Sequence, residues 1–130
     1  MRKRPPDQGA AFWQVTGGAW LNVMDPSQSD SAEGLAGFDQ VIKTHEMIGA
    51  NIGLPYFRAH FAHALAKHGK LDEAYQASQL AVRENEANNL WCWYAEVLRL
   101  HAAICEQVDR AKDQARYLAE AAALAWSQGA

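Results

Sequence analysis

Histidine and cysteine are the residues of this chain whose types and spacing could support chemistry. His60 and His63 are three residues apart, and His101 and Cys105 are four apart. If both segments are helical, each pair projects from one face of its helix. Imidazole and thiolate are preferred ligands of Zn²⁺, so the two pairs could form a four-ligand site if their helices are neighbours. The favoured interpretation is that these histidines are packed, hydrogen-bonded side chains, and we expect neither a metal nor a cofactor.

No other motif in the sequence points to catalysis. The chain has no glycine-rich phosphate loop, no HExxH, no CxxC and no serine nucleophile elbow. Its two cysteines, Cys92 and Cys105, are too few for a disulfide framework and are interpreted as small buried apolar residues. We therefore predict that the protein is not an enzyme.

The segment 54–86 is the clearest structural unit in the sequence, and it predicts two helices joined by a tight turn. Pro55 suits the first turn of a helix, where its missing N–H costs nothing. Gly69 can adopt the left-handed conformation that ends a helix. Asp72 and Glu73 then favour the first turn of the next helix, because negative charge is stabilised at the positive end of the helix dipole.

The remaining helices are predicted from apolar periodicity and polar breaks. They cover residues 10–24, 31–48 and 90–107, with a last one beginning near Asp109 or Lys112. Small residues at Gly34, Ala74 and Ala115 lie 40 and 41 residues apart, a period that indicates helical repeats. The predicted organisation is a disordered tail over 1–9 and a single domain over 10–130, with hairpins at about 10–49, 54–86 and 90–128.

Composition limits the classes of binding partner and the cellular compartments that we expect for this protein. Hydrophobic residues make up 49% and charged residues 21%, which predicts a folded chain. A net charge of −3 argues against nucleic acid and anionic membranes as partners. No apolar run approaches the ~20 residues needed to span a bilayer, and the basic first residues are not followed by an apolar signal segment. These features favour a cytoplasmic protein.

The central hairpin resembles the tetratricopeptide repeat. The resemblance is carried by small, large and turn residues at matching spacings: Ala62, Leu65, Gly69, Ala74 and Ala81. Arg58, Ser78 and Glu86 depart from that pattern, which often has Trp, an aromatic residue and Pro at these positions. More specifically, residues 53–82, 91–104 and 121–130 look like the repeat region that follows the ATPase module in bacterial multidomain adenylate/guanylate cyclases and helix-turn-helix regulators.

The resemblance implies an all-α fold, a right-handed superhelical stack of three antiparallel helix hairpins. The first helix of each hairpin would line a concave groove. The residues expected to face this groove are Tyr56, Ala59, His63, Ala66, Lys67, Arg99 and Glu106. Glu96 is three residues from Arg99, so these two side chains could pair, either in the groove or on a solvated helix face. The mixture suits a peptide segment better than a deep small-molecule pocket.

Helices at the ends of a repeat stack expose apolar surface, so a homodimer contact is also expected there. Its candidate residues are Trp13 and Trp20 at one end and Leu118 and Trp126 at the other. The predicted function is a non-catalytic scaffold or regulatory module in bacterial signalling that binds a protein or peptide. The alternative is a small-ligand or metal-binding sensor that uses the neighbourhood of His60, His63 and His101.

Overall fold

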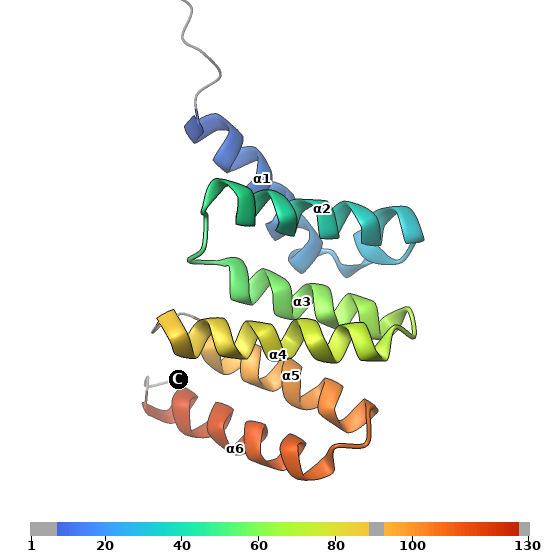
Figure 1. Cartoon of the computed structure of the whole chain (residues 1–130), viewed down its shortest axis with the longest axis vertical. Coiled ribbons are helices and arrows are strands. Elements are labelled where there is room, and N and C mark those ends of the chain that lie inside the picture. Colours follow the sequence, from blue (N-terminus) through green and yellow to red (C-terminus); the bar gives the residue numbers. More distant parts are fainter. Residues whose placement is uncertain (1–7, 89–92, 128–130) are drawn as a thin grey trace, which may run out of the picture.

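The structure is a computed structural model that describes residues 8–88 and 93–127, without the side chains of 8–15 and 111. Within these ranges the fold is all-α, as predicted (Figure 1). The elements are α1 (Gln8–Met24), the 3₁₀ helix η1 (Pro26–Ser29), α2 (Ala32–Ile48), α3 (Leu54–Lys67), α4 (Leu71–Asn88), α5 (Tyr94–Gln107) and α6 (Ala111–Ser127).

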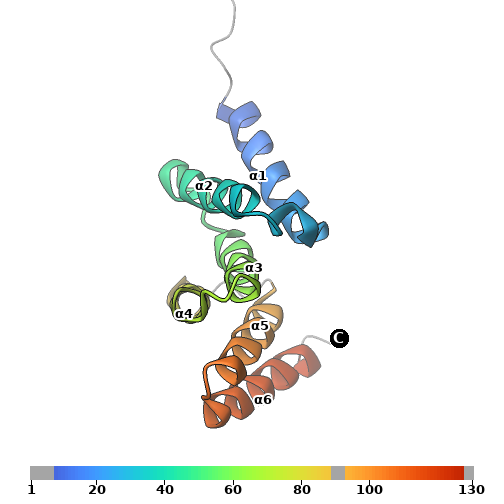
Figure 2. The same ribbon diagram turned by 90° about the vertical axis from the view of Figure 1, so that its right-hand side faces the viewer.

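The six α-helices of the described chain pack in sequential pairs, and each helix contacts its neighbours in the sequence. Beyond these neighbours, α3 also contacts α1 and α5. Figure 2 shows α2 and α4 displaced to the same side of α3, while α1 lies on the other side of the stack from α2. The predicted hairpin stack is confirmed at this level, and its right-handed superhelical sense stays a prediction.

Local signals place the helix ends close to where the sequence predicts them. The Ser31 side chain caps α2 by accepting a hydrogen bond from the N–H of Gly34 at 2.9 Å. Gly49 ends α2 and Gly69 follows α3, both in the left-handed region, with φ of 71° and 75°. The N–H of Lys70 reaches back to the carbonyl of Leu65, which closes the predicted turn.

Small residues allow the helices of the central hairpin to approach each other closely. Ala59, Ala62, Ala74 and Ala81 are all fully buried between helices. Larger apolar side chains fill the space on either side of them, chiefly Phe38, Ile42, Leu54, Phe57, Leu65, Val97, Leu98, Leu100 and Ile104. Tight packing of this kind is what fixes one helix register over its alternatives.

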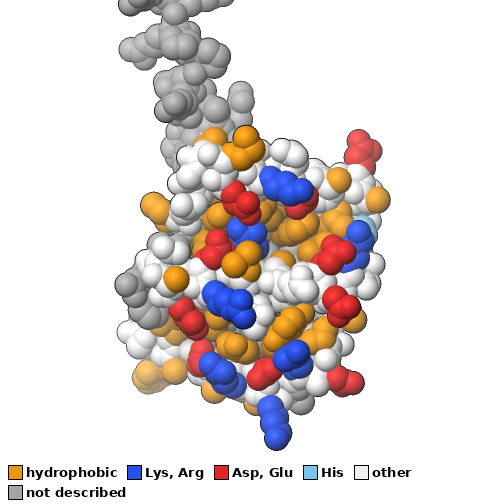
Figure 3. Space-filling model, in the orientation of Figure 1, with side chains coloured by type: hydrophobic (Ala, Val, Ile, Leu, Met, Phe, Trp, Pro, Cys, Tyr) orange, Lys and Arg blue, Asp and Glu red, His pale blue; other side chains and the backbone are white. Residues whose placement is uncertain are grey.

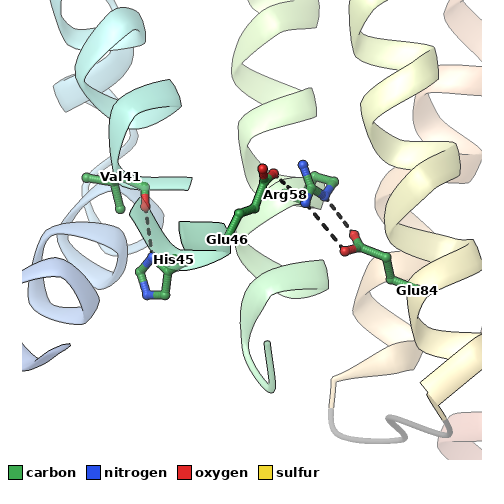
Figure 4. A network of polar contacts seen from close by, with 5 residues as sticks. All are labelled: Val41, His45, Glu46, Arg58 and Glu84. Carbon is green, nitrogen blue, oxygen red and sulfur yellow. Dashed lines mark hydrogen bonds and ion pairs between the residues drawn. The ribbon is translucent and has the colours of Figure 1, made fainter. Parts of the chain in front are cut away.

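Arg58 is a buried cation that joins three helices. Its guanidinium donates to Glu84 of α4 at 2.7 Å and to Glu46 of α2 at 2.8 Å (Figure 4). Its side chain is only 11% exposed, whereas those of Glu46 and Glu84 are 46% and 23% exposed. Burial alone would lower the pKa of Arg58, but the bonds and charges of the two carboxylates outweigh it and raise the pKa.

We expect Arg58→Ala to lower the free energy of unfolding by about 2 kcal/mol, because it leaves two carboxylates without their cation and removes packed methylene groups. The matched control is Arg99→Ala, which removes an Arg–Glu pair whose arginine side chain is 56% exposed. That change should cost less than about 1 kcal/mol. Urea unfolding of both variants measures the difference, and equal losses would show that burial does not strengthen the Arg58 network.

Candidate functional site

One face of α3 carries a stripe of polar and aromatic side chains. Tyr56, His60, His63 and Lys67 follow each other at spacings of four, three and four residues, so they share a face. The first three are half-buried and Lys67 is exposed. The opposite side of α3 is buried, which fixes the direction in which this stripe points.

Helix α5 places an ion pair beside this stripe. Arg99 donates from Nε to Glu96 at 2.9 Å, and its Nη2 bonds the other carboxylate oxygen. These bonds lower the pKa of Glu96. Both charges act on the pKa values of His60 and His63, and α3 contacts α5 directly. We call these side chains the α3–α5 strip: Tyr56, His60, His63, Lys67, Glu96 and Arg99.

The two histidines of the strip favour their neutral forms at pH 7. Burial lowers the pKa of His60 to about 4 against the opposing effect of Glu96. The pKa of His63 is also lowered, first by burial and then by the positive charges of Lys67 and Arg99. The strip therefore presents neutral imidazole beside separate acidic and basic groups.

A small cavity lies between this stripe and the end of α1. It has a volume of about 30 Å³, and its polar lining includes Asn22, Ser29, His60 and His63. The Nε2 atom of His60 is buried without a hydrogen-bond partner in the described structure. This volume has room for a single water molecule, so the cavity is too small for an organic ligand.

A shallow depression of about 350 Å³ lies on the other side of the strip, between α5 and α6. Glu96 and Arg99 form its polar edge. Its other lining residues are apolar: Ala95, Leu118, Ala121, Ala122 and Ala125. The ion pair thus stands between an apolar surface on one side and the histidines on the other.

Three of the predicted groove residues are not part of the α3–α5 strip. Ala59 is fully buried in the core, so its prediction as a groove residue is wrong; the α3 stripe passes through His60 instead. Ala66 is half-buried and packs on the Leu35 side of the helix stack. Glu106 accepts a hydrogen bond from Gln114 of α6 at 3.0 Å, and no described contact joins it to the α3–α5 strip.

No described contact joins His101 to the other two histidines of the predicted sensor neighbourhood. It is fully buried, with Nδ1 2.6 Å from the Ser78 hydroxyl and Nε2 3.6 Å from the Cys105 sulfur. Burial lowers its pKa to about 4. The described residues contain no group of three His, Cys, Asp or Glu side chains that could hold a metal ion. The packed interpretation of His101 and of Cys105 is thus confirmed by their burial, and Cys92 lies outside the described residues.

The residues predicted for self-association differ in their surroundings. Trp20 packs inside the molecule against Tyr56, Phe57 and Trp93, with ring centroids 5.3–5.6 Å apart. Leu118 and Trp126 of α6 are 43% and 81% exposed. The side chain of Trp13 lies outside the described residues. Of the predicted set, α6 therefore offers the larger described apolar surface to another chain.

The face that carries α2 and α4 has interspersed charges. Figure 3 shows acidic and basic side chains mixed with hydrophobic ones, and neither sign forms a continuous patch on this face. Besides the Arg58 network, Lys43 pairs with Asp39 and Arg116 pairs with Glu120.

None of the described helices is long and apolar enough to cross a membrane.

The structure establishes an all-helical domain whose six described helices pack in sequential pairs. Comparisons of the chain with protein-family models, with curated proteins and with solved structures found no match.

Sequence reasoning missed the apolar half of this site. Ala122 and Ala125 look like core residues in the sequence, and only the packing of α6 on α5 leaves them beside Glu96 and Arg99. Sequence reasoning also considered His60 as a possible metal ligand and did not place it on the same helix face as Tyr56, His63 and Lys67. The spacing from Tyr56 to Lys67 carried that signal, because it traces one helical face.

Proposed function

We propose that this domain is a non-catalytic interaction module that binds a peptide segment across the α3–α5 strip. The observation that carries the proposal is the order of surfaces across the two helices. Lys67 and the histidines come first, then the Glu96–Arg99 pair, and then the apolar depression. An extended or helical peptide can contact all three, whereas a compact small molecule can contact only one.

The charges of the strip indicate the chemistry of the peptide. Arg99 is paired with Glu96, but Lys67 makes no ion pair within the described structure. A peptide carboxylate near Lys67 and an apolar side chain in the depression would each find a complementary group. Tyr56 adds an aromatic edge, although its ring also packs against Trp20 and Trp93.

The wider context of the proposal comes from the sequence. The resemblance to tetratricopeptide-like repeats of bacterial signalling proteins favours a scaffold or regulatory role in the cytoplasm. Buried His101 and its partners Ser78 and Cys105 are fully inaccessible, so they offer no nucleophile to a substrate. A second copy of the chain is the other candidate occupant of the depression, because Leu118 lies there and is exposed.

We expect Lys67→Glu to weaken the binding of selected peptides by about fivefold or more, because it replaces the attracting charge with a repelling one. Peptides would first be selected on the unmodified protein from a display library of random 12-residue sequences. Their affinities for the variant would then be measured by calorimetry. The selected sequences should share an acidic residue next to an apolar one.

Lys70→Glu is the matched control, because Lys70 is exposed in the turn just beyond α3 and the change in charge is identical. Its affinities should stay within about twofold of the unmodified protein. A library that yields no binder, or binders indifferent to Lys67→Glu, would contradict the proposal. Light scattering at about 100 μM shows whether a second copy occupies the surface instead, since self-association depends on protein concentration.

A further inference from the structure

A second cavity lies where α1, α2 and α3 meet. Its described lining is uncharged, unlike the α3–α5 strip. Its volume is about 300 Å³, at the lower end of the range of small-molecule sites. The loop of residues 49–53 forms one side, and the rings of Trp20, Phe57 and Trp93 form another. The described lining contains no Asp, Glu, Lys or Arg. A charged ligand would lose its hydration there without gaining a counter-charge, so the cavity suits a neutral one.

The aromatic wall is formed by residues that hold each other in place. The Trp20 ring meets the Phe57 ring edge-on, with centroids 5.3 Å apart and planes at 88°, and meets the Trp93 ring at 5.5 Å and 82°. Edge-to-face contacts of this kind are favourable beyond simple burial. The wall is therefore preformed, which reduces the ordering cost of binding a flat molecule against it.

Trp93 reaches this wall from a backbone conformation that is unusual for its type. Its φ is 59°, in the left-handed region, where a bulky side chain costs roughly 1 kcal/mol or more. It precedes α5 without making a side-chain cap. Trp93 as a whole is 41% exposed, and Ile52 on the opposite loop is 74% exposed. Two large apolar groups thus border the cavity and remain partly open to solvent.

The polar side chains that line the cavity are those of Thr16, His45 and Asn51. Thr16 and His45 are bonded to each other, and the direction of that hydrogen bond can be assigned. The His45 Nδ1–H donates to the Val41 carbonyl at 2.9 Å, as Figure 4 shows. In the neutral imidazole Nε2 is then the acceptor, and the Thr16 hydroxyl lies 3.3 Å from it as donor. That bond occupies the one lone pair of Nε2, so the free lone pairs of the Thr16 oxygen make this part of the wall an acceptor, which a ligand O–H or N–H would satisfy.

We propose that this cavity binds a small neutral aromatic molecule of one or two rings that carries a hydrogen-bond donor, as phenols and indoles do. The ring packs against Trp20, Phe57 and Trp93, and the donor faces the Thr16–His45 pair. None of the cavity's lining residues belongs to the α3–α5 strip, although Trp20 and Trp93 contact Tyr56 of the strip. It also differs from the predicted sensor neighbourhood, because none of its lining residues is His60, His63 or His101.

The test titrates ¹⁵N-labelled protein with p-cresol and with toluene, which differ by one hydroxyl, and follows amide and indole resonances. We expect saturable p-cresol binding with a dissociation constant of about 1 mM or tighter, as is usual for a ligand of this size. The shifts should centre on residues 49–53 and on the Trp20 indole. Toluene should bind about threefold to tenfold more weakly, because it cannot donate a hydrogen bond.

A pair of variants locates the site independently. Ala50→Phe places a ring in the cavity and should abolish saturable binding of both probes, since Ala50 lines the cavity. Ala36→Phe makes the same change at an exposed position of α2 and should leave binding within twofold. The proposal is overturned if p-cresol shows no saturable binding, if its shifts map elsewhere, or if toluene binds equally well. The shift map decides the question even if Ala50→Phe does not fold.

Discussion

Gly34→Ala is expected to lower the free energy of unfolding by about 2–3 kcal/mol, the upper part of the usual range for overpacking. A methyl group at this position would stand 1.9 Å from the carbonyl oxygen of Gln28, well inside van der Waals contact. The obstacle is backbone, so no side-chain rotation can relieve it. The substituted protein must instead move η1 away from the first turn of α2.

Movement of η1 would disturb bonds that tie it to its surroundings. The Ser29 carbonyl, next to Gln28, lies 2.6 Å from His68 Nε2 at the end of α3. The Ser29 hydroxyl donates to Asn22 of α1 at 3.0 Å. Asp25 caps η1 by accepting from the N–H of Ser27. A shift large enough to admit the methyl group would weaken contacts to two other helices at once.

Gly37→Ala is the matched control on the same helix. A methyl group there meets nothing within 4 Å, so the substitution only removes the conformational freedom of glycine. It should raise stability by about 0.5–1 kcal/mol. Urea unfolding of the two variants therefore should give changes of opposite sign. Equal stability of Gly34→Ala and the unmodified protein would show that η1 can move away from α2 without a measurable cost in free energy.

Acid is expected to destabilise the protein before its carboxylates titrate. Burial lowers the pKa of His101 from 6.5 to about 4, with smaller effects of Asp113 and Arg110 in opposite directions. A lowered folded-state pKa means that the unfolded chain takes up the proton first as the pH falls. The contribution of neutral His101 to the free energy of unfolding is complete above about pH 6.5 and is lost progressively towards pH 4.

Through His101 the free energy of unfolding is expected to fall by about 2 kcal/mol between pH 7.5 and pH 5, and by about 3 kcal/mol by pH 4. His60 acts in the same direction, since burial also lowers its pKa to about 4, but it is only half-buried and adds less. Urea unfolding at a series of pH values measures the slope. Working above pH 5 separates the histidines from the carboxylates.

His101→Gln isolates the contribution of the buried histidine. The amide cannot titrate in this range but can still hydrogen-bond the Ser78 hydroxyl, which otherwise lies 2.6 Å from His101 Nδ1. The variant should show a clearly shallower loss of stability between pH 7.5 and 5, whatever its stability at neutral pH. His60→Gln should change the slope less. If stability falls with pH equally steeply in His101→Gln and in the unmodified protein, His101 is not the cause of the loss in acid.

The helical elements follow from local sequence. The Ser31 cap acts on Gly34, three residues away, and the turn at Gly69 joins residues at most five apart. Interactions of this range are written in consecutive residues, so helix ends and the hairpin order are readable without tertiary information. The small residues Ala62, Ala74 and Ala81, which carry the resemblance to the tetratricopeptide repeat, are all fully buried.

The roles of the polar residues depend on tertiary structure. Arg58 and Ser78 depart from the tetratricopeptide pattern, and each is buried against a polar partner on another helix. Glu84 is 26 residues from Arg58, and His101 is 23 residues from Ser78. A single sequence carries no signal for such pairings, because the partner is set by how the helices stack. The same holds for the cavity, where Thr16 meets His45 across 29 residues.

The sequence by itself thus determined the all-α class, the hairpin turns and the apolar faces, since each depends on contacts within a few residues. Tertiary structure alone decided that Ala59 is core while His60 joins the strip, and that His101 is buried against Ser78. One residue step turns a helix position by about 100°, so a short periodic pattern gives a face only approximately. Packing against neighbouring helices fixes the remaining rotation, and with it which side chains can meet a partner.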